Sequence, residues 1–155
     1  MRDAGHEHFD SVATGMAAER LCERAMLDFT AAFDIGDVES MARNFAEDGV
    51  WKRQDGVIAG IAQLRQMMGA RPAGLHVRHV LSNVRTTFVS ASEAEVESYV
   101  TVYRQDFAGA PRLPAPLAGP NLVGRYRDRL SLRAGGWKLA AREVIVDFKQ
   151  QPEKK

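Results

Sequence analysis

A histidine in an otherwise apolar row is the first residue of this chain that suggests chemistry. Residues 75–90, LHVRHVLSNVRTTFVS, have the composition and alternation of a β-strand. Because alternate strand residues share a face, His79 lies on the same face as Val77 and Leu81. A buried neutral imidazole needs partners for both its donor and its acceptor. His79 is therefore either a core histidine bonded to a backbone carbonyl or a general base inside a pocket.

A carboxylate stands where a helix is expected to end, in the sequence AAFDIGD. The last turn of a helix carries partial negative charge, which disfavours Asp34 there by roughly 0.3–1 kcal/mol. Asp34 either faces solvent or is held by a cationic or hydrogen-donating partner. A histidine oriented by a carboxylate is a stronger base with a fixed tautomer. Contact between Asp34 and His79 would therefore create a group able to remove a proton.

Arg142 is the third polar residue on an apolar face, since it alternates with Ala140 and Val144. An arginine there is costly unless an anion pairs with it. The candidate partners are carboxylates across the sheet, Asp34, or an anionic group of a substrate. The alternative is an arginine at the sheet edge whose head reaches water. Together with His79, these residues indicate that separate elements enclose a partly polar pocket.

Metal and nucleophilic chemistry are poorly supported. His76 and His79 lie three residues apart on a strand and point to opposite faces, so they cannot chelate one ion. His6 and His8 form a His-x-His pair without a third ligand nearby in sequence. The single cysteine, Cys22, excludes an internal disulfide and lies in a helical pattern typical of a small buried residue. We predict no metal and no cofactor.

The length of 155 residues and the ordinary apolar content predict one soluble domain that can bury a core and a pocket. A net charge of +1 provides no field to attract nucleic acid. Arginines in residues 125–133 alternate with other residue types, which is typical of a solvated or subunit-facing strand.

No apolar run approaches the roughly 20 residues of a membrane helix, and residues 1–15 lack a signal-peptide core. We expect a cytoplasmic protein that binds neither nucleic acid nor a membrane.

Helices are expected first along the chain. Residues 1–15 are polar and predict a mobile tail, and a single domain follows at 16–149. Helical spacing predicts a helix over 17–35 with Gly36 as its stop, and an apolar stripe of Leu21, Ala25, Phe29, Ala32 and Phe33. Asp37 is expected to cap a second helix over 38–48. A short strand and turn around Asp55 and a third helix over 60–71 come next.

Four β-rich segments fill the second half, at 75–90, 93–107, 122–134 and 136–148. Residues 108–121 hold four of the six prolines and predict a loop over the sheet edge or the pocket mouth. Residues 150–155 form a polar tail. Helices followed by strands predict an α+β fold, a curved mixed or antiparallel sheet with three helices on one face.

This layout resembles the SnoaL-like branch of the NTF2-like (cystatin-like) superfamily, an α+β cone around a pocket. The resemblance is carried by FDIGDVESMARNFAEDGVW, GIAQLRQMM, RHVLSNVRTTFVSASEAEVESYV and GRYRDRLSLRAGGWKLAAREVIVDF, and covers most of residues 17–148. It implies the fold, but this fold hosts unrelated activities, so function must be argued from the site.

Enzymes of that branch, namely hexachlorocyclohexane dehydrochlorinase, scytalone dehydratase and bile-acid 7α-dehydratase, use an Asp–His dyad. Asp34 and His79 match its two places, and Arg142 in WKLAAR matches an arginine of the dehydrochlorinase. The resemblance implies that His79 is a general base oriented by Asp34, with Arg142 stabilising negative charge. It departs at Phe29, where those enzymes carry a lysine or tyrosine, because phenylalanine cannot donate a proton. Either another donor serves, with Tyr126, Tyr103 and Arg142 as the candidates, or the reaction needs no such donor.

We therefore expect a cofactor-independent dehydratase or other lyase that acts on a small, hydrophobic, cyclic substrate. The expected substrate-binding residues are Phe29, Trp51, Tyr103 and Tyr126. An isomerase that uses the same dyad is the first alternative. A non-catalytic subunit resembling the β subunit of ring-hydroxylating dioxygenases is the second. The open face of such a sheet predicts a homo-oligomer, and the resemblance implies that it is a dimer or a trimer.

Overall fold

The computed structural model describes the backbone of residues 4–151 and the side chains of residues 11–151. The helices and strands of this part follow in chain order: α1 (Ala4–Ile35), α2 (Val38–Asn44), β1 (Phe45–Arg53), β2 (Gly56–Ala59), α3 (Gly60–Gly69), β3 (Leu75–Ser90), β4 (Glu93–Asp106), β5 (Leu122–Arg133) and β6 (Gly136–Lys149). The turn expected at Asp55 joins β1 to β2, and the four β-rich segments are the four long strands.

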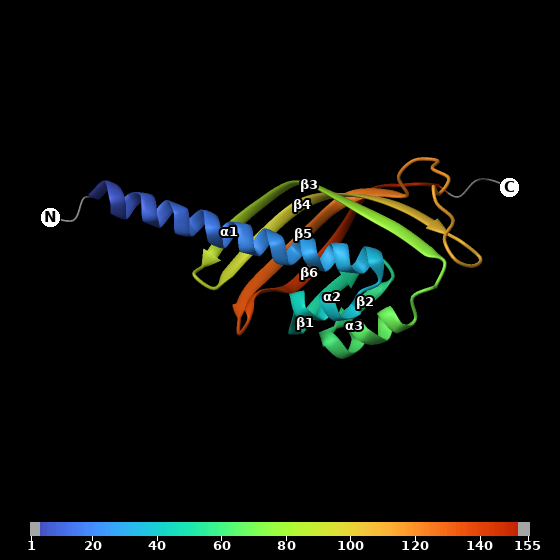
Figure 1. Ribbon diagram of the computed structural model, residues 1–155, viewed down its shortest axis with the longest axis horizontal. Helices are drawn as coiled ribbons and strands as arrows, with labels where there is room; N and C mark the ends of the chain where they lie inside the picture. Colours follow the sequence, from blue (N-terminus) through green and yellow to red (C-terminus); the bar gives the residue numbers. More distant parts are fainter. Residues whose placement is uncertain (1–3, 152–155) are drawn as a thin grey trace.

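One curved sheet forms the body of the described chain, in the strand order β2-β1-β6-β5-β4-β3. Strands β3 to β6 form an antiparallel meander, whereas β1 pairs with β6 in parallel. The long helix α1 crosses one face of this sheet, and α2 and α3 lie beside β1 and β2 (Figure 1). The predicted α+β fold with a mixed curved sheet and three helices is confirmed.

The core lies between α1 and the inner face of the sheet. Helix α1 buries Cys22, Met26 and Phe29 completely, and these residues pack with strand residues such as Leu130. The interpretation of Cys22 as a buried small residue is therefore confirmed. Leu21 was expected in the buried stripe, but that expectation is wrong, since its side chain is 58% exposed. The stripe is centred one position later because residues 22, 25, 26, 29 and 32 point toward the sheet.

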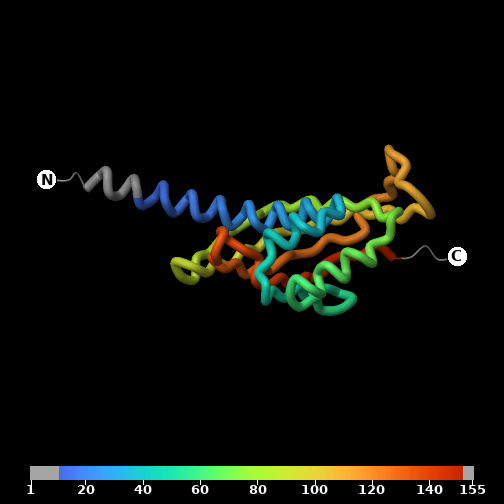
Figure 2. The backbone as a smooth tube through the Cα atoms, turned by 60° about the horizontal axis from the view of Figure 1, so that its bottom comes forward, coloured from blue at the N-terminus to red at the C-terminus, as the bar shows by residue number. Residues whose placement is uncertain are grey.

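Three predicted helix boundaries need correction, and the smallest concerns the third helix, which ends at Gly69 rather than at residue 71. Helix α1 begins at Ala4 rather than at residue 17, and its N-terminal part extends past the sheet (Figures 1 and 2), so the expected tail over residues 1–15 is helical from Ala4 onward. The histidine side chains at positions 6 and 8 lie outside the described residues. The second helix ends at Asn44 rather than at residue 48, because Phe45 already pairs with Leu139 of β6.

The end of α1 is fixed at the point where it meets the sheet edge. Gly36 has a φ of 78°, a conformation that favours glycine and stops the helix. Asp37 then caps α2, as expected, by accepting a hydrogen bond from the Ser40 backbone N–H at 3.0 Å. The last residues of α1 lie beside β3, which is an edge strand of the sheet.

Candidate active site

Asp34 and His79 meet where α1 ends beside β3. The Asp34 Oδ1 atom lies 2.6 Å from His79 Nδ1, and its Oδ2 atom accepts a hydrogen bond from the His79 backbone N–H at 2.9 Å. The two side chains are only 9% and 10% exposed. Because an ionised carboxylate can only accept, the contact favours the tautomer that carries its proton on Nδ1. His79 Nε2 has no hydrogen-bond partner among the described residues and can accept a proton.

The position of β3 at the sheet edge makes this double contact possible. An edge strand has backbone N–H groups on its outer side that the sheet does not use. Asp34 takes one of them and so fixes the His79 backbone and imidazole together. The Phe33 ring packs edge-on against the imidazole at 5.5 Å between centroids, which further restricts its rotation.

Arg71 offsets the repulsion between the Asp34 carboxylate and the partial negative charge at the C-terminus of α1. Its Nη2 donates to the Asp34 backbone carbonyl at 3.1 Å, and its charge also interacts with the Asp34 carboxylate. The guanidinium lies over the Phe33 ring at 5.0 Å. Burial lowers the pKa of Arg71, an effect that Asp34 opposes. No pattern in the sequence singled out this arginine, which lies 37 positions after Asp34.

His79 opens onto a cavity of about 310 Å³ between the end of α1 and the inner face of the sheet. Its walls are mainly apolar and aromatic, from Phe33, Trp51, Leu75, Val77, Val102, Leu122, Tyr126 and Val144. Its polar lining comes from Arg53, Gln54, Asp55, Arg104, Asn121 and Lys149. Residue 121 ends the proline-rich loop, which was expected over the sheet edge or the pocket mouth. The cavity can hold a small apolar molecule against the imidazole.

Two of the predicted substrate-binding residues lie in this cavity wall. Tyr126 is 3% exposed, and its hydroxyl has no hydrogen-bond partner among the described residues. Burial raises the pKa of Tyr126 to about 12, an effect that the nearby Arg142 guanidinium opposes. Trp51 is 5% exposed, and its Nε1–H is buried without a partner in the described chain. The Tyr126 hydroxyl is therefore available to a ligand as a hydrogen-bond donor, whereas the Trp51 Nε1–H is enclosed by the protein.

Arg142 does not lie in the cavity at His79, where the resemblance to the dehydrochlorinase implied it. It donates to both carboxylate oxygens of Asp128, at 2.8 and 2.6 Å, and to the Thr30 hydroxyl at 3.0 Å. The ion pair is almost completely buried, with 1% and 0% of the two side chains exposed. Arg142 is absent from the lining of the cavity at His79. The expected role of Arg142 against the reacting atoms is corrected to a buried structural ion pair.

Phe29 and Tyr103 also lie away from the cavity. Phe29 is fully buried in the core, where it packs on Phe45 and Trp51, so its expected contact with substrate is wrong. Tyr103 follows Val102 on β4 and therefore points to the other face of the sheet. There it lines a separate hollow together with residues 115–117 of the proline-rich loop.

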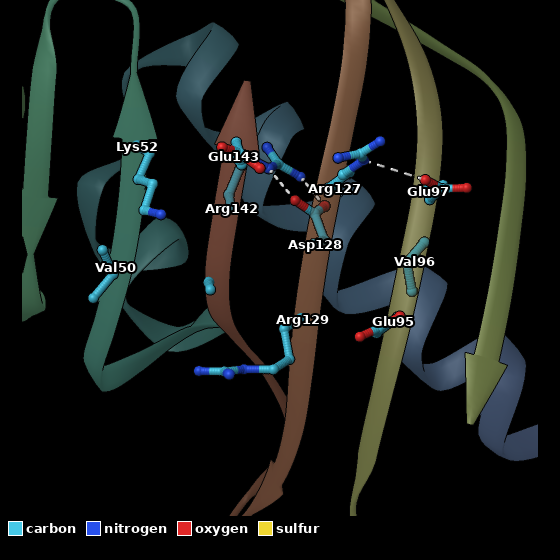
Figure 3. A pocket seen from close by; sticks show the side chains of 11 residues that line it. Val50, Lys52, Glu95, Val96, Glu97, Arg127, Asp128, Arg129, Arg142 and Glu143 are labelled. Atoms are coloured by element: carbon cyan, nitrogen blue, oxygen red, sulfur yellow. Dashed lines mark hydrogen bonds and ion pairs between the residues drawn. The ribbon is translucent and has the colours of Figure 1, made fainter. Parts of the chain in front are cut away.

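The outer face of the sheet carries a larger hollow of about 690 Å³ (Figure 3). The side chains that face it are mostly charged, with Lys52 and Glu143 beside Arg127 and Arg129. Arg127 pairs with Glu97 across the strands at 3.4 Å, and Arg125 pairs with Asp147 at 2.9 Å. These pairs agree with the interpretation of the arginine row as a solvated strand face.

Two further findings concern the described part of the chain. It holds no group of three or more His, Cys, Asp or Glu residues placed to bind a metal ion. No helix within it is long and apolar enough to cross a membrane.

The family follows from comparison with known proteins. A family model described as a SnoaL-like domain matches residues 16–143, so the chain belongs to the SnoaL-like family. The resemblance inferred from the sequence motifs is thereby confirmed. Comparison with curated proteins gave no match.

Solved structures with this fold include enzymes. A protein of unknown function with a cystatin-like fold from Nostoc punctiforme is 26% identical, with a TM-score of 0.66 over 83% of this chain and 90% of that one. A candidate scytalone dehydratase from Novosphingobium aromaticivorans is 24% identical, with a TM-score of 0.71 over 93% of each chain. A hexachlorocyclohexane dehydrochlorinase, LinA type 2, is 18% identical, with a TM-score of 0.70 over 92% and 91%. At these identities the last two establish the fold alone.

Proposed function

We propose that this protein is a cofactor-independent lyase of the dehydratase type, with His79 as general base and Asp34 as the residue that orients it. The observation that carries the proposal is the 2.6 Å contact between His79 Nδ1 and Asp34 Oδ1 beside an apolar cavity. That contact leaves Nε2 free to take a proton. The dehydratase and dehydrochlorinase among the structural neighbours make elimination the first reaction to test.

The reaction follows from what this site can hold. A small hydrophobic, cyclic substrate fills the cavity of about 310 Å³ with its acidic C–H bond facing His79. Nε2 removes the proton, the C–H electron pair forms a double bond, and the leaving group departs from the adjacent carbon. The imidazolium that forms is stabilised by the Asp34 carboxylate. General-base assistance of this kind contributes about 10²–10⁴-fold to the rate.

Substitution of the two residues tests the assignment. Cyclic β-hydroxy ketones are screened for loss of water by mass spectrometry, with the native chain and with His79→Ala and Asp34→Asn. Both variants are expected to lose turnover and to keep the native circular dichroism spectrum. His76→Ala is the matched control, because His76 lines hollows outside the cavity at His79. Turnover retained in His79→Ala would contradict the mechanism.

An isomerase would use the same pair of residues, since proton removal is its first step as well. The two reactions differ in the fate of the proton. Isomerisation returns it to another carbon and leaves the mass of the substrate unchanged, whereas elimination lowers that mass by one water. The same screen therefore separates the two functions.

A further inference from the structure

Loss of a hydroxyl group is faster when a proton donor assists the base, because hydroxide is a poor leaving group. Phe29, the position where the resemblance implied a donor, cannot donate a proton and is buried in the core. Tyr103 faces the other side of the sheet, and Arg142 is bound to Asp128. Of the three replacements considered from the sequence, the structure leaves Tyr126 in the cavity with His79.

We propose that Tyr126 is the catalytic acid of this site and that its substrates lose an oxygen leaving group rather than a halide. The inference rests on the proposed function and names its second reacting residue and its substrate class. Tyr126 and His79 line one cavity from different strands, β5 and β3. The Tyr126 hydroxyl has no protein partner in the described chain and is free to contact a ligand.

The surroundings of Tyr126 fix its ring and keep the phenol protonated. The Arg142 guanidinium lies over the ring face, 4.0 Å from its centroid, and is itself held by Asp128. Burial raises the pKa of Tyr126 to about 12, so the group carries its proton throughout the neutral range. Water, the conjugate acid of hydroxide, is a much weaker acid than this phenol, so proton transfer from the phenol to the departing oxygen is downhill. A chloride ion leaves without a proton and would gain nothing from this donor.

Each bond and proton is accounted for in the proposed step. His79 Nε2 takes the proton from the carbon next to the carbonyl group, and its electron pair becomes the double bond. The C–O bond breaks, and the departing oxygen takes the Tyr126 proton and leaves as water. The histidinium proton then returns to the phenolate through a water molecule. The net reaction converts the substrate into an unsaturated product and water, and no co-reactant is needed.

The test compares two leaving groups on one ring system. The probes are 3-hydroxy-1-indanone and 3-chloro-1-indanone, which give the same product, and its absorbance is followed after subtraction of the uncatalysed rate. Tyr126→Phe is expected to lower kcat for the hydroxy ketone by about 10²–10⁴-fold and for the chloro ketone by less than about threefold. Tyr103→Phe is the matched control on the opposite face and should change neither rate. Equal losses on both probes, or no loss with the hydroxy ketone, would overturn the assignment.

A binding measurement separates failure of this inference from failure of the proposed function. In a His79→Ala background, dissociation constants are measured for 3-hydroxy-1-indanone and 1-indanone, with and without Tyr126→Phe. A hydrogen bond from Tyr126 to the hydroxyl oxygen gives a preference of roughly three- to tenfold for the hydroxy ketone, and this preference disappears in Tyr126→Phe. If the native chain shows this binding preference but does not turn over the hydroxy ketone, elimination is contradicted, and the contact between Tyr126 and the hydroxyl group is supported. An unchanged preference in Tyr126→Phe would refute the role of Tyr126.

Discussion

The buried ion pair between Asp128 and Arg142 supports a quantitative prediction about stability. Arg142→Met removes the guanidinium and leaves the Asp128 carboxylate, 0% exposed, without its charged partner. Loss of one partner from a buried pair costs about 3–5 kcal/mol. For a chain of this length, each kcal/mol lowers Tm by about 2–4 °C, so the expected drop is roughly 6–20 °C. Urea unfolding and thermal melts followed by circular dichroism measure both quantities.

The pH dependence of this loss has a definite sign. Burial raises the pKa of Asp128, and the Arg142 guanidinium opposes that rise. In Arg142→Met nothing opposes it, so the folded variant binds a proton more readily than the unfolded chain does. Such a group costs no stability below its unfolded pKa of about 3.9, and the cost grows as pH rises above that value. The deficit relative to the native chain should therefore be larger at pH 7 than at pH 4.

A double variant decides whether the arginine is structural or catalytic. In Asp128→Val with Arg142→Met, neither charge is left unpaired, and such replacements are often neutral or stabilising. If Arg142 is structural, this variant regains most of the lost stability and eliminates chloride from 3-chloro-1-indanone, a reaction that does not depend on Tyr126, within about tenfold of the native rate. A variant that melts like the native chain but has lost about a hundredfold or more in kcat for the chloro ketone would show that Arg142 acts on the reacting atoms.

Three other predictions follow from particular contacts. The Cys22 thiol, whose pKa burial raises to about 12, should resist iodoacetamide at pH 8 in the native chain and react in urea, as measured by mass spectrometry. Gly74→Ala should lower the free energy of unfolding by about 1–3 kcal/mol in urea titrations, because its Cβ would lie 1.9 Å from the Phe107 carbonyl oxygen. Arg71→Met should lower kcat by about tenfold and shift the Nδ1 proton resonance of the histidine bound to Asp34.

The Asp34–His79 contact could be predicted because both residues conflict with their local patterns. A carboxylate at a helix end and an imidazole in an apolar strand row each lack a partner, and each can satisfy the other. Family resemblance placed both residues at one site. The second contact, from the His79 backbone N–H, depends on β3 being the edge strand, and strand order is not readable from local periodicity.

The true partner of Arg142 also left a signal in the sequence. Asp128 alternates with Tyr126 and Leu130, so it too is a charged residue on an apolar row. Opposite charges on the apolar rows of consecutive strands predict an ion pair, provided that the strands pair so that the two residues lie opposite each other. The observed register places Asp128 directly opposite Arg142. The family resemblance implied a catalytic role for Arg142, whereas the alternation pattern alone favours its pairing with Asp128.

The errors in α1 have a different origin. Helical periodicity locates a stripe to within one position, and a residue rotates by about 100° from one position to the next. Placing the stripe on Leu21 instead of Cys22 was enough to expect a buried side chain that is in fact 58% exposed. The early start of the helix was missed because apolar spacing reports burial against a sheet, and the first turns of α1 extend past the sheet.

The two least exposed charged pairs of the described chain differ in what they leave unsatisfied, and that difference supports the functions that we propose for them. Arg142 donates three hydrogen bonds within the protein, and with 1% of its side chain exposed it is not accessible to a substrate in the cavity. The pair of Asp34 and His79 uses one ring nitrogen and leaves the other free at a cavity wall. Acid–base catalysis requires an atom that can give or take a proton and can form a hydrogen bond to the substrate during the reaction. His79 Nε2 and the Tyr126 hydroxyl meet that requirement on one cavity, whereas the buried pair holds the Tyr126 ring in position.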